Sequence, residues 1–372
     1  MTDLSLMATL QSFGERIAVH TVSASHSYRD LCLAVECQRE RLRAAGVVTG
    51  ETVFLQGGYS FDGIAMLLAL YLNANIVAMN TSGNACEIDD KLRTAQAGFF
   101  ADLRDGTLRD LRAPSGAAEA LPLVERLREQ GLAGLILFSS GTTGRPKAML
   151  HDLSRLVESY LGRRPRQINM LLFLLFDHIG GINTVLNVLA IGGTATIPPQ
   201  NTPEHVADMV ERFKVNVLPT SPTFLNLLLL SGALDRHEMA SLRLVTYGTE
   251  PMPAGLLARL RERLPRVRLV QTFGTSETGI ISTAAMASDN LYMKFDDPAI
   301  EHKVVDGELW LRSKRRILGY LNHTSDALTD DGWFITGDAV EEQEDGSIRI
   351  LGRRKEVINV GGEKGRWCTD AE

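Results

Sequence analysis

One feature constrains the fold and function of this chain more than any other: a short apolar run followed at once by hydroxyl residues and glycines. Residues 135–138 are Leu-Ile-Leu-Phe, which predicts a buried strand. In the loop that follows, glycines let backbone N–H groups turn inward and hydroxyls add donors without bulk, as phosphate oxygens require. A solvated turn is the alternative, because Ser, Thr and Gly are common in turns. The loop predicts a phosphate site with these candidate ligands: Ser139, Ser140, Gly141, Thr142, Thr143, Gly144 and Lys147.

The spacing of this loop differs from the P-loop of ordinary nucleotide hydrolases. Pro146 precedes Lys147, and no Ser or Thr follows the lysine. The loop resembles instead the phosphate-binding signature of the adenylate-forming superfamily, which includes acyl-CoA synthetases, aryl-CoA ligases, luciferases and peptide-synthetase adenylation domains. That signature is an aromatic residue, Thr or Ser, Ser, Gly-Thr-Thr-Gly, any residue, and Pro-Lys. Ser139 replaces the usual Thr and keeps its hydroxyl.

The resemblance implies an activity. In this superfamily ATP and Mg²⁺ activate a carboxylic acid to an acyl-adenylate with release of pyrophosphate, and a thiol then accepts the acyl group. The implied enzyme is an AMP-forming acid–thiol ligase, with CoA or an acyl or peptidyl carrier protein as acceptor. Two alternatives stay open: a non-catalytic protein that binds nucleotide or acyl-adenylate, and an amino-acid-activating adenylation domain.

Composition and charge narrow the class of protein further. At 372 residues, with 44% hydrophobic and 23% charged residues, the chain is expected to be a globular protein of several subdomains. A net charge of −6 gives no general attraction to nucleic acid or to anionic membranes. The longest apolar run, 170–176, is too short to span a bilayer, and no secretory signal is visible. The four cysteines lack metal-type spacing, so we expect a reducing, cytoplasmic location and no nucleic-acid or membrane partner.

Helical and strand patterns alternate up to residue 290, which predicts an α/β fold with parallel sheets covered by helices. Within it we expect an exposed-edge strand at 99–103, a loop over 104–120 and a strand buried on both faces at 170–176. Beyond residue 290, short segments between Gly and Asp turns predict antiparallel strands of a small barrel-like subdomain. The resemblance implies that these units form a layered αβαβα large domain. The expected units are 1–180 with the phosphate loop, 181–290 as a second α/β subdomain, 291–351 as the β-rich subdomain, and 352–372 as a hinge and truncated tail.

A second motif, Thr-Phe-Gly-Thr-Ser-Glu-Thr at 272–278, follows a predicted strand. Its polar residues therefore emerge at the carboxyl end of a sheet, where α/β folds bind ligands. It resembles the aromatic-Gly-x-x-Glu motif of the superfamily, with Phe273 and Gly274 in the first two positions. The resemblance implies that Glu277 holds Mg²⁺, which prefers oxygen ligands, and that Thr275 lies near the α-phosphate and the reacting carboxylate. A helix N-cap with the glutamate in the first turn is the alternative.

Three further segments resemble nucleotide-binding parts of the family. Gly248, Thr249 and Glu250 resemble the adenine-binding turn, where Gly248 lets the flat base lie against the backbone; a plain strand-to-helix turn is the alternative. Asp338, in Thr-Gly-Asp, is implied to accept from both ribose hydroxyls, although a hairpin turn has the same residues. Arg353, in a segment that resembles the family's hinge, is implied to reach the ribose; a charged strand end is the alternative.

The acid pocket is indicated by Asp177-His178-Ile179-Gly180-Gly181. This order resembles the aromatic-His-x-Gly-Gly segment of the ligases, so His178 joins Thr275 and Glu277 as a catalytic candidate that borders the acyl group. A structurally satisfied histidine is one alternative. Another is an alignment in which Asp177 binds a substrate ammonium, as in amino-acid-activating domains. The unbroken His-x-Gly-Gly order favours an aryl or acyl acid without an α-amine.

The superfamily's small C-terminal domain is expected to be absent, because the sequence stops at Glu372, a few residues after the hinge-like segment. In the family that domain supplies a lysine to the reacting carboxylate and α-phosphate, and it rotates to admit the thiol. We therefore expect this chain alone to show weak adenylation and weaker thioester formation.

Overall fold

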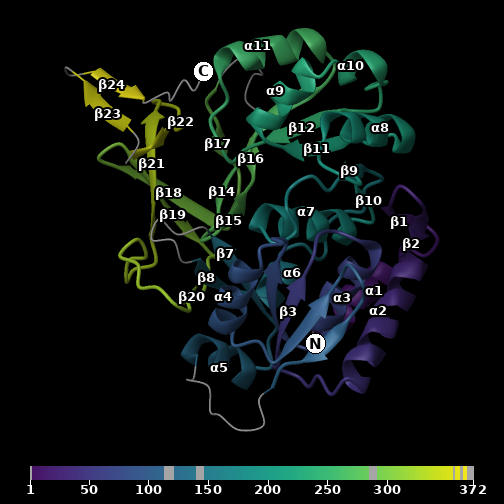
Figure 1. Ribbon diagram of the computed structural model, residues 1–372. Helices are drawn as coiled ribbons and strands as arrows, with labels where there is room; N and C mark the ends of the chain where they lie inside the picture. Colours follow the sequence, from purple (N-terminus) through teal and green to yellow (C-terminus); the bar gives the residue numbers. More distant parts are fainter. Residues whose placement is uncertain are drawn as a thin grey trace.

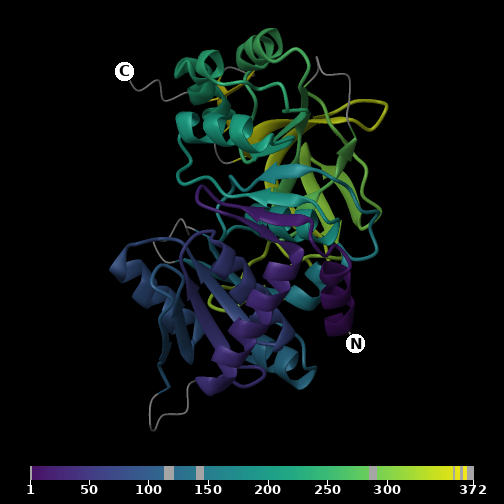
Figure 2. The ribbon, with the colours of Figure 1, turned by 90° about the vertical axis from the view of Figure 1, so that its right-hand side faces the viewer.

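The computed structural model describes residues 2–112, 121–139, 146–284, 291–354, 357–360 and 363–366. Within these residues two seven-stranded sheets, with the helices that pack on them, form most of the structure (Figure 1). The first sheet has the strand order β20-β8-β7-β4-β3-β5-β6, and the second has the order β13-β12-β11-β9-β10-β1-β2. In Figure 2 the first sheet and its helices lie below the second.

The first sheet has parallel central strands that are buried on both faces. Val53 and Leu55 point into the cluster between the two sheets, whereas Phe54 packs on the opposite face with residues of α4 and α5. This explains why its strands read as continuous apolar runs. The strands are β3 (Thr52–Gln56), β4 (Ile76–Asn80), β5 (Phe99–Asp102), β6 (Leu108–Asp110), β7 (Gly134–Ser139), β8 (Lys147–Asp152) and β20 (Gly319–Tyr320).

The second sheet is parallel except for the edge strand β2, which runs antiparallel to β1. Its carboxyl edge therefore collects the loops that follow β11, β12 and β13, which is where open α/β sheets bind ligands. The strands are β1 (Ile17–His20), β2 (Ser25–Ser27), β9 (Asn169–Leu171), β10 (Thr194–Thr196), β11 (Val217–Thr220), β12 (Leu244–Tyr247) and β13 (Arg268–Gln271).

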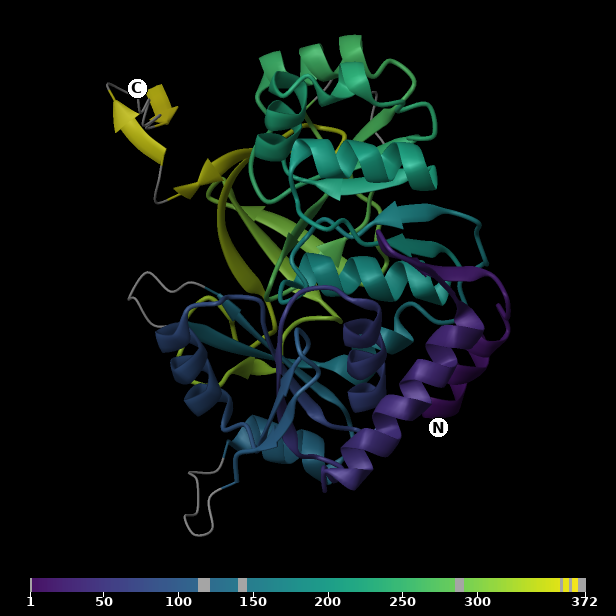
Figure 3. The same cartoon turned by 45° about the vertical axis from the view of Figure 1, so that its right-hand side comes forward.

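Helices fill three layers around the two sheets. A central cluster of apolar side chains joins α1, α2, α3, α6 and α7 to the facing sides of both sheets, and Figure 3 shows α7 between them. Separate clusters pack α4 and α5 on the far side of the first sheet, and α8, α9 and α11 on the far side of the second. The expected αβαβα layering is confirmed. The helices are α1 (Thr2–Gln11), α2 (Tyr28–Ala44), α3 (Phe61–Leu72), α4 (Ala85–Ala95), α5 (Pro122–Glu129), α6 (Leu153–Glu158), α7 (Ile179–Ala190), α8 (Pro203–Phe213), α9 (Pro222–Leu230), α10 (Ala233–Arg236) and α11 (Ala254–Arg263).

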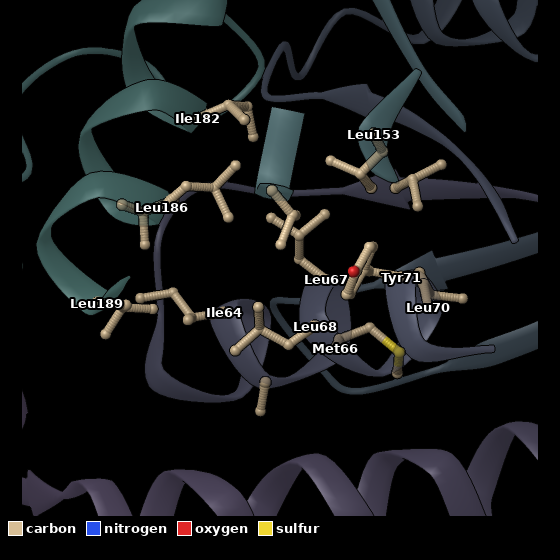
Figure 4. Close-up of a cluster of buried hydrophobic side chains, with 14 of the residues drawn as sticks. Ile64, Met66, Leu67, Leu68, Leu70, Tyr71, Leu153, Ile182, Leu186 and Leu189 are labelled. Carbon is tan, nitrogen blue, oxygen red and sulfur yellow. The ribbon is translucent and has the colours of Figure 1, made fainter. Parts of the chain in front are cut away.

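Helix α3 lies at the centre of this core and buries ten of its 12 residues. Because it is apolar all round, both the first sheet and the neighbouring helices can pack against it. In Figure 4, Ile64 and Leu67 of α3 lie near Ile182 and Leu186 of α7. The Ser60 side chain accepts from the Gly63 N–H and so caps the helix at its start. This packing fixes the position of α7 relative to the first sheet.

The remaining strands are antiparallel, and they extend on both sides of the expected β-rich unit 291–351. Four of them form a sheet in the order β18-β19-β21-β22, and the others pair in twos. They are β14 (Phe273–Thr275), β15 (Gly279–Ile281), β16 (Thr283–Ala284), β17 (Lys294–Phe295), β18 (Ile300–Val305), β19 (Glu308–Ser313), β21 (Phe334–Glu342), β22 (Ile348–Arg353), β23 (Val357–Val360) and β24 (Glu363–Arg366).

Several local expectations were wrong. The predicted strand at 170–176 is only three residues long, because the chain leaves the sheet after β9. The strand at 99–103 is not an exposed edge: β6, in the predicted loop 104–120, pairs with β5 and covers it. The chain also crosses between units, since β1 and β2 join the second sheet and β20 joins the first. No helix in the described part of the chain is long and apolar enough to cross a membrane.

Candidate functional site

The predicted phosphate loop leaves and re-enters the first sheet at one place. Ser139, the last residue of β7, lies directly opposite Lys147, the first residue of β8. The amide of Asn322 holds the re-entering end, because it donates to the Pro146 carbonyl at 2.8 Å and accepts from the Ala148 N–H at 3.0 Å. The base of the loop is therefore fixed by contacts on both strands. The other predicted ligands lie outside the described residues: Ser140, Gly141, Thr142, Thr143 and Gly144.

Glu277 lies in the turn of the β14–β15 hairpin. Within this turn the Thr275 Oγ1 accepts from the Thr278 N–H at 3.1 Å and lies 2.9 Å from the Thr278 Oγ1. Both threonines are buried, so the turn is held from inside. Phe273 and Gly274 form the first strand of the hairpin, and Gly274 lies opposite Ile280. The helix N-cap alternative for this segment is wrong, because the chain turns back as a second strand.

Tyr320 connects this hairpin to the phosphate loop. Its hydroxyl donates to the Glu277 Oε1 at 2.8 Å, and its ring centroid lies 6.0 Å from the Lys147 Nζ. Burial, followed by the charge of Glu277, raises the pKa of the Tyr320 phenol. The phenol therefore stays protonated near neutral pH and remains a donor. Lys147 and Glu277, far apart in the sequence, therefore both lie near one tyrosine.

Asp338 and Arg353 lie opposite each other on β21 and β22. The Arg353 Nε is 3.3 Å from the Asp338 Oδ1, and the Asp338 N–H donates to the Thr336 Oγ1 at 3.0 Å. Burial raises the pKa of Asp338, the Arg353 charge and the Thr336 hydrogen bond oppose this, and the charges of Glu308 and Glu277 add to it. The hairpin-turn alternative is wrong, because Asp338 lies inside a strand.

The predicted adenine turn follows β12 and lies against the chain that enters the hairpin. A Cβ on Gly248 would come within 2.9 Å of the Thr272 carbonyl, so the two segments touch backbone to backbone. Thr249 has a left-handed φ of +71°. Both carboxylate oxygens of Glu250 accept from Thr223, its N–H at 2.6 Å and its hydroxyl at 2.8 Å. Glu250 therefore holds the start of α9, while the turn leads into α11 as a strand-to-helix connection.

His178 immediately precedes α7, and its side chain is 61% exposed. The neighbouring Asp177 is buried; its Oδ2 accepts from the Thr81 N–H at 2.9 Å, and its Oδ1 lies 4.0 Å from the His178 Nε2. A Cβ on Gly180 would approach Ile280 of the hairpin at 4.0 Å. The start of α7 thus packs against the hairpin that carries Glu277, with the His178 ring in solvent.

The donor set fits a magnesium ion that is shared with a ligand. Among the described residues no group of three His, Cys, Asp or Glu side chains could hold a metal by itself. Glu277 offers a carboxylate on the hairpin that Tyr320 joins to Lys147 at the base of the loop. Mg²⁺ is commonly bound by one or two carboxylates together with phosphates and water. The residues present therefore fit Mg²⁺ bound with a polyphosphate.

Sequence reasoning missed Tyr320 and Asn322, the two side chains that join these parts. In the sequence they stand in a Gly-Tyr-Leu-Asn stretch at 319–322, which has no hydrophobic periodicity that would predict a strand. They are recognisable only once β20 is seen to pair with β8.

Comparisons with known proteins found similar sequences and structures. A family model described as AMP-binding enzyme matches residues 6–321. A 4-coumarate-CoA ligase from Narcissus pseudonarcissus is 29% identical over 257 residues, covering 60% of this chain and 47% of that protein. The chain spans about half the length of the curated relatives it matches first.

Solved structures show the same fold. One is the o-succinylbenzoate CoA synthetase MenE from Bacillus subtilis, in complex with its acyl-adenylate intermediate OSB-AMP, with a TM-score of 0.78 and 22% identity over 97% of this chain and 80% of that one. Another is the N-terminal domain of FACL13 from Mycobacterium tuberculosis, with a TM-score of 0.73 and 18% identity over 94% of this chain and 99% of that one.

Proposed function

The chain belongs to the family of AMP-binding enzymes, and on this premise we propose that it activates a carboxylic acid with ATP. The acid's carboxylate attacks the α-phosphate, pyrophosphate leaves, and an acyl-adenylate forms. The observation that carries the proposal is Tyr320, whose hydroxyl donates to Glu277 and whose ring centroid lies 6.0 Å from the Lys147 Nζ, so that residues of two distant motifs lie close together. Positioning and charge neutralisation supply most of the rate in such chemistry.

The phosphate end of ATP is assigned to the loop between β7 and β8. Ser139 offers a hydroxyl and Lys147 a cation at its base, and Ser140, Thr142 and Thr143 are the further ligands. Mg²⁺, when bound, neutralises phosphate charge. Glu277 would hold it, because its carboxylate is joined through Tyr320 to the neighbourhood of Lys147.

The nucleoside end is assigned to Asp338 and Arg353, with adenine against Gly248 and Thr249. A buried carboxylate beside an arginine is a suitable acceptor for two neighbouring ribose hydroxyls. Support for the adenine position is the backbone contact between Gly248 and Thr272. Glu250 takes a different role here: it fixes the turn through Thr223.

The acid is assigned to the surface where the start of α7 meets the β14–β15 hairpin, with Thr275 and His178 at its border. Support comes from the packing of Gly180 against Ile280. The amino-acid-activating alternative would use Asp177, but one of its oxygens already accepts from Thr81. A thiol such as that of CoA, or of a carrier protein, is the proposed acceptor. The described cysteines Cys32, Cys37 and Cys86 are free, in line with a reducing compartment such as the cytoplasm.

ATP–pyrophosphate exchange with a panel of aryl, acyl and amino acids tests this function. At least one acid should support exchange above background, and Glu277→Gln should lower the rate roughly 100-fold, as expected when a carboxylate that holds a catalytic metal loses its charge. The matched control is Glu342→Gln, an exposed glutamate on β21, which should leave the rate unchanged. ATP binding without exchange for any acid would instead assign the chain to the non-catalytic class.

A further inference from the structure

The segment 317–322 reaches the base of the phosphate loop from a distant part of the chain. Its β20 part pairs antiparallel with β8, with Tyr320 opposite Met149. The Leu318 N–H donates to the Leu150 carbonyl at 2.8 Å and the Leu321 N–H to the Ala148 carbonyl at 2.9 Å. Together with the two Asn322 hydrogen bonds, these contacts fix the segment along the whole re-entering end of the loop.

The same segment is also fixed to the hairpin that carries Glu277. The Ile317 N–H donates to the Glu277 backbone carbonyl at 2.8 Å, and the Tyr320 hydroxyl donates to the Glu277 Oε1 at 2.8 Å. Glu277 is thus held at both its backbone and its side chain by residues of one short segment. Rotation of the carboxylate is restricted, because one of its two oxygens has a directed donor.

We propose that Tyr320 is a positioning residue that orients the Glu277 carboxylate for Mg²⁺. This inference rests on the proposed function. The hydroxyl donates to one carboxylate oxygen and leaves the other without this hydrogen bond, so that the other oxygen would be available to the metal. The ring centroid lies 6.0 Å from the Lys147 Nζ, so the same side chain is also close to the cation at the base of the phosphate loop. Donors that orient a metal-binding carboxylate commonly change metal affinity 10- to 100-fold when they are lost.

The test is Tyr320→Phe in the full chain, which keeps the ring and removes only the donor. ATP binding is measured by calorimetry in EDTA and over a Mg²⁺ titration. We expect ATP affinity in EDTA to be unchanged and the Mg²⁺ concentration for half-maximal tightening to rise roughly 10-fold. The control is Tyr28→Phe, far from the site, whose hydroxyl donates to the Leu189 and Gly193 carbonyls. It should lower the melting temperature without moving the Mg²⁺ requirement.

A double-mutant cycle separates positioning from a general effect. Because Tyr320 acts through Glu277, Tyr320→Phe should add nothing to the Mg²⁺ requirement of Glu277→Gln. An unchanged Mg²⁺ requirement in Tyr320→Phe overturns the inference. So does a Tyr320→Phe shift that is equally large in the wild-type and Glu277→Gln chains. In either case the proposed function stands as long as the wild-type chain binds ATP. Loss of affinity in EDTA as large as that in Mg²⁺ also overturns it, since the tyrosine would then act on the nucleotide or the fold. A wild-type chain that binds no ATP under either condition rejects the function and the inference together.

Discussion

Asp338 and Arg353 face each other across adjacent antiparallel strands, with the guanidinium 3.3 Å from a carboxylate that is almost fully buried. Arg353 also donates to the Thr336 carbonyl, at 2.5 Å, while Thr336 itself donates to Leu309. Two strands thus present an acceptor whose charge is only partly compensated. A carboxylate so placed is costly to bury, and a ligand with two donors would relieve that cost.

Replacing Asp338 with Asn should weaken ATP binding roughly 10- to 100-fold, because hydrogen bonds to a charged acceptor contribute about 1.5–3 kcal/mol. Calorimetry with ATP and 2′-deoxy-ATP checks the cause. Wild type should favour ATP, and Asp338→Asn should lose most of that preference. Equal losses for both nucleotides would place the carboxylate away from the 2′-hydroxyl.

The same substitution should stabilise the unliganded chain at neutral pH. Burial raises the pKa of Asp338, so its contribution to stability is full below its ordinary value of 3.8 and is lost as the pH rises through the folded-state pKa. Asp338→Asn removes that penalty, and its melting temperature should exceed that of wild type by about 1–3 °C near neutral pH. The difference should shrink as the pH approaches 4. A lower melting temperature at neutral pH would mean that the pairing with Arg353 outweighs burial.

Gly181→Ala should destabilise the fold by about 3 kcal/mol, because the new methyl group would lie 2.0 Å from the Leu175 carbonyl and 2.6 Å from the Tyr59 hydroxyl. Thermal unfolding measures the loss. Gly255→Ala is the matched control: it lies in α11 with nothing within 4 Å of a new Cβ, and should be neutral or slightly stabilising. Equal melting temperatures for the two variants would contradict the close packing at the start of α7.

His237 should make stability depend on pH near neutrality. Its ring bonds Glu204 and Glu211 of α8 at 2.9 and 2.8 Å, and these hydrogen bonds raise its pKa. The stabilisation is full below the ordinary value of 6.5 and is lost as the pH rises through the folded-state pKa. The melting temperature of wild type should therefore exceed that of His237→Ala by more at pH values below 6.5 than above. Arg236, which also bonds Glu204, is kept in both chains. A gap that does not change with pH would rule out this linkage.

Local sequence patterns predicted the helices and strands of the layers well, because burial of apolar residues in each element depends mostly on its own sequence. Helix α3 and strand β3 follow from apolar runs bounded by polar residues, and such runs can be recognised in the sequence. The run at 170–176 misled because burial does not require a strand: beyond β9, Phe173 is partly buried against Phe224 and its carbonyl accepts from Asn201. An apolar sequence cannot distinguish these two kinds of burial.

The residues of the candidate site likewise include some that the sequence predicts and some that it does not. Glu277 and Asp338 could be proposed from short motifs, because each motif resembles a known one. Tyr320 could not, since its role depends on pairing with Met149 and on contact with Glu277, both distant in the sequence. The Thr223 contact of Glu250 is likewise non-local and was not foreseen.

The edge strand β20 has a consequence for how this protein is synthesised. Ala148 and the Asn322 side chain that holds it are 174 residues apart. While the ribosome is still translating the intervening chain, β8 is an unpaired edge, and such edges invite pairing with other chains. The nascent protein therefore completes this edge of the first sheet only after Asn322 has emerged, so premature release would leave that edge open to aggregation.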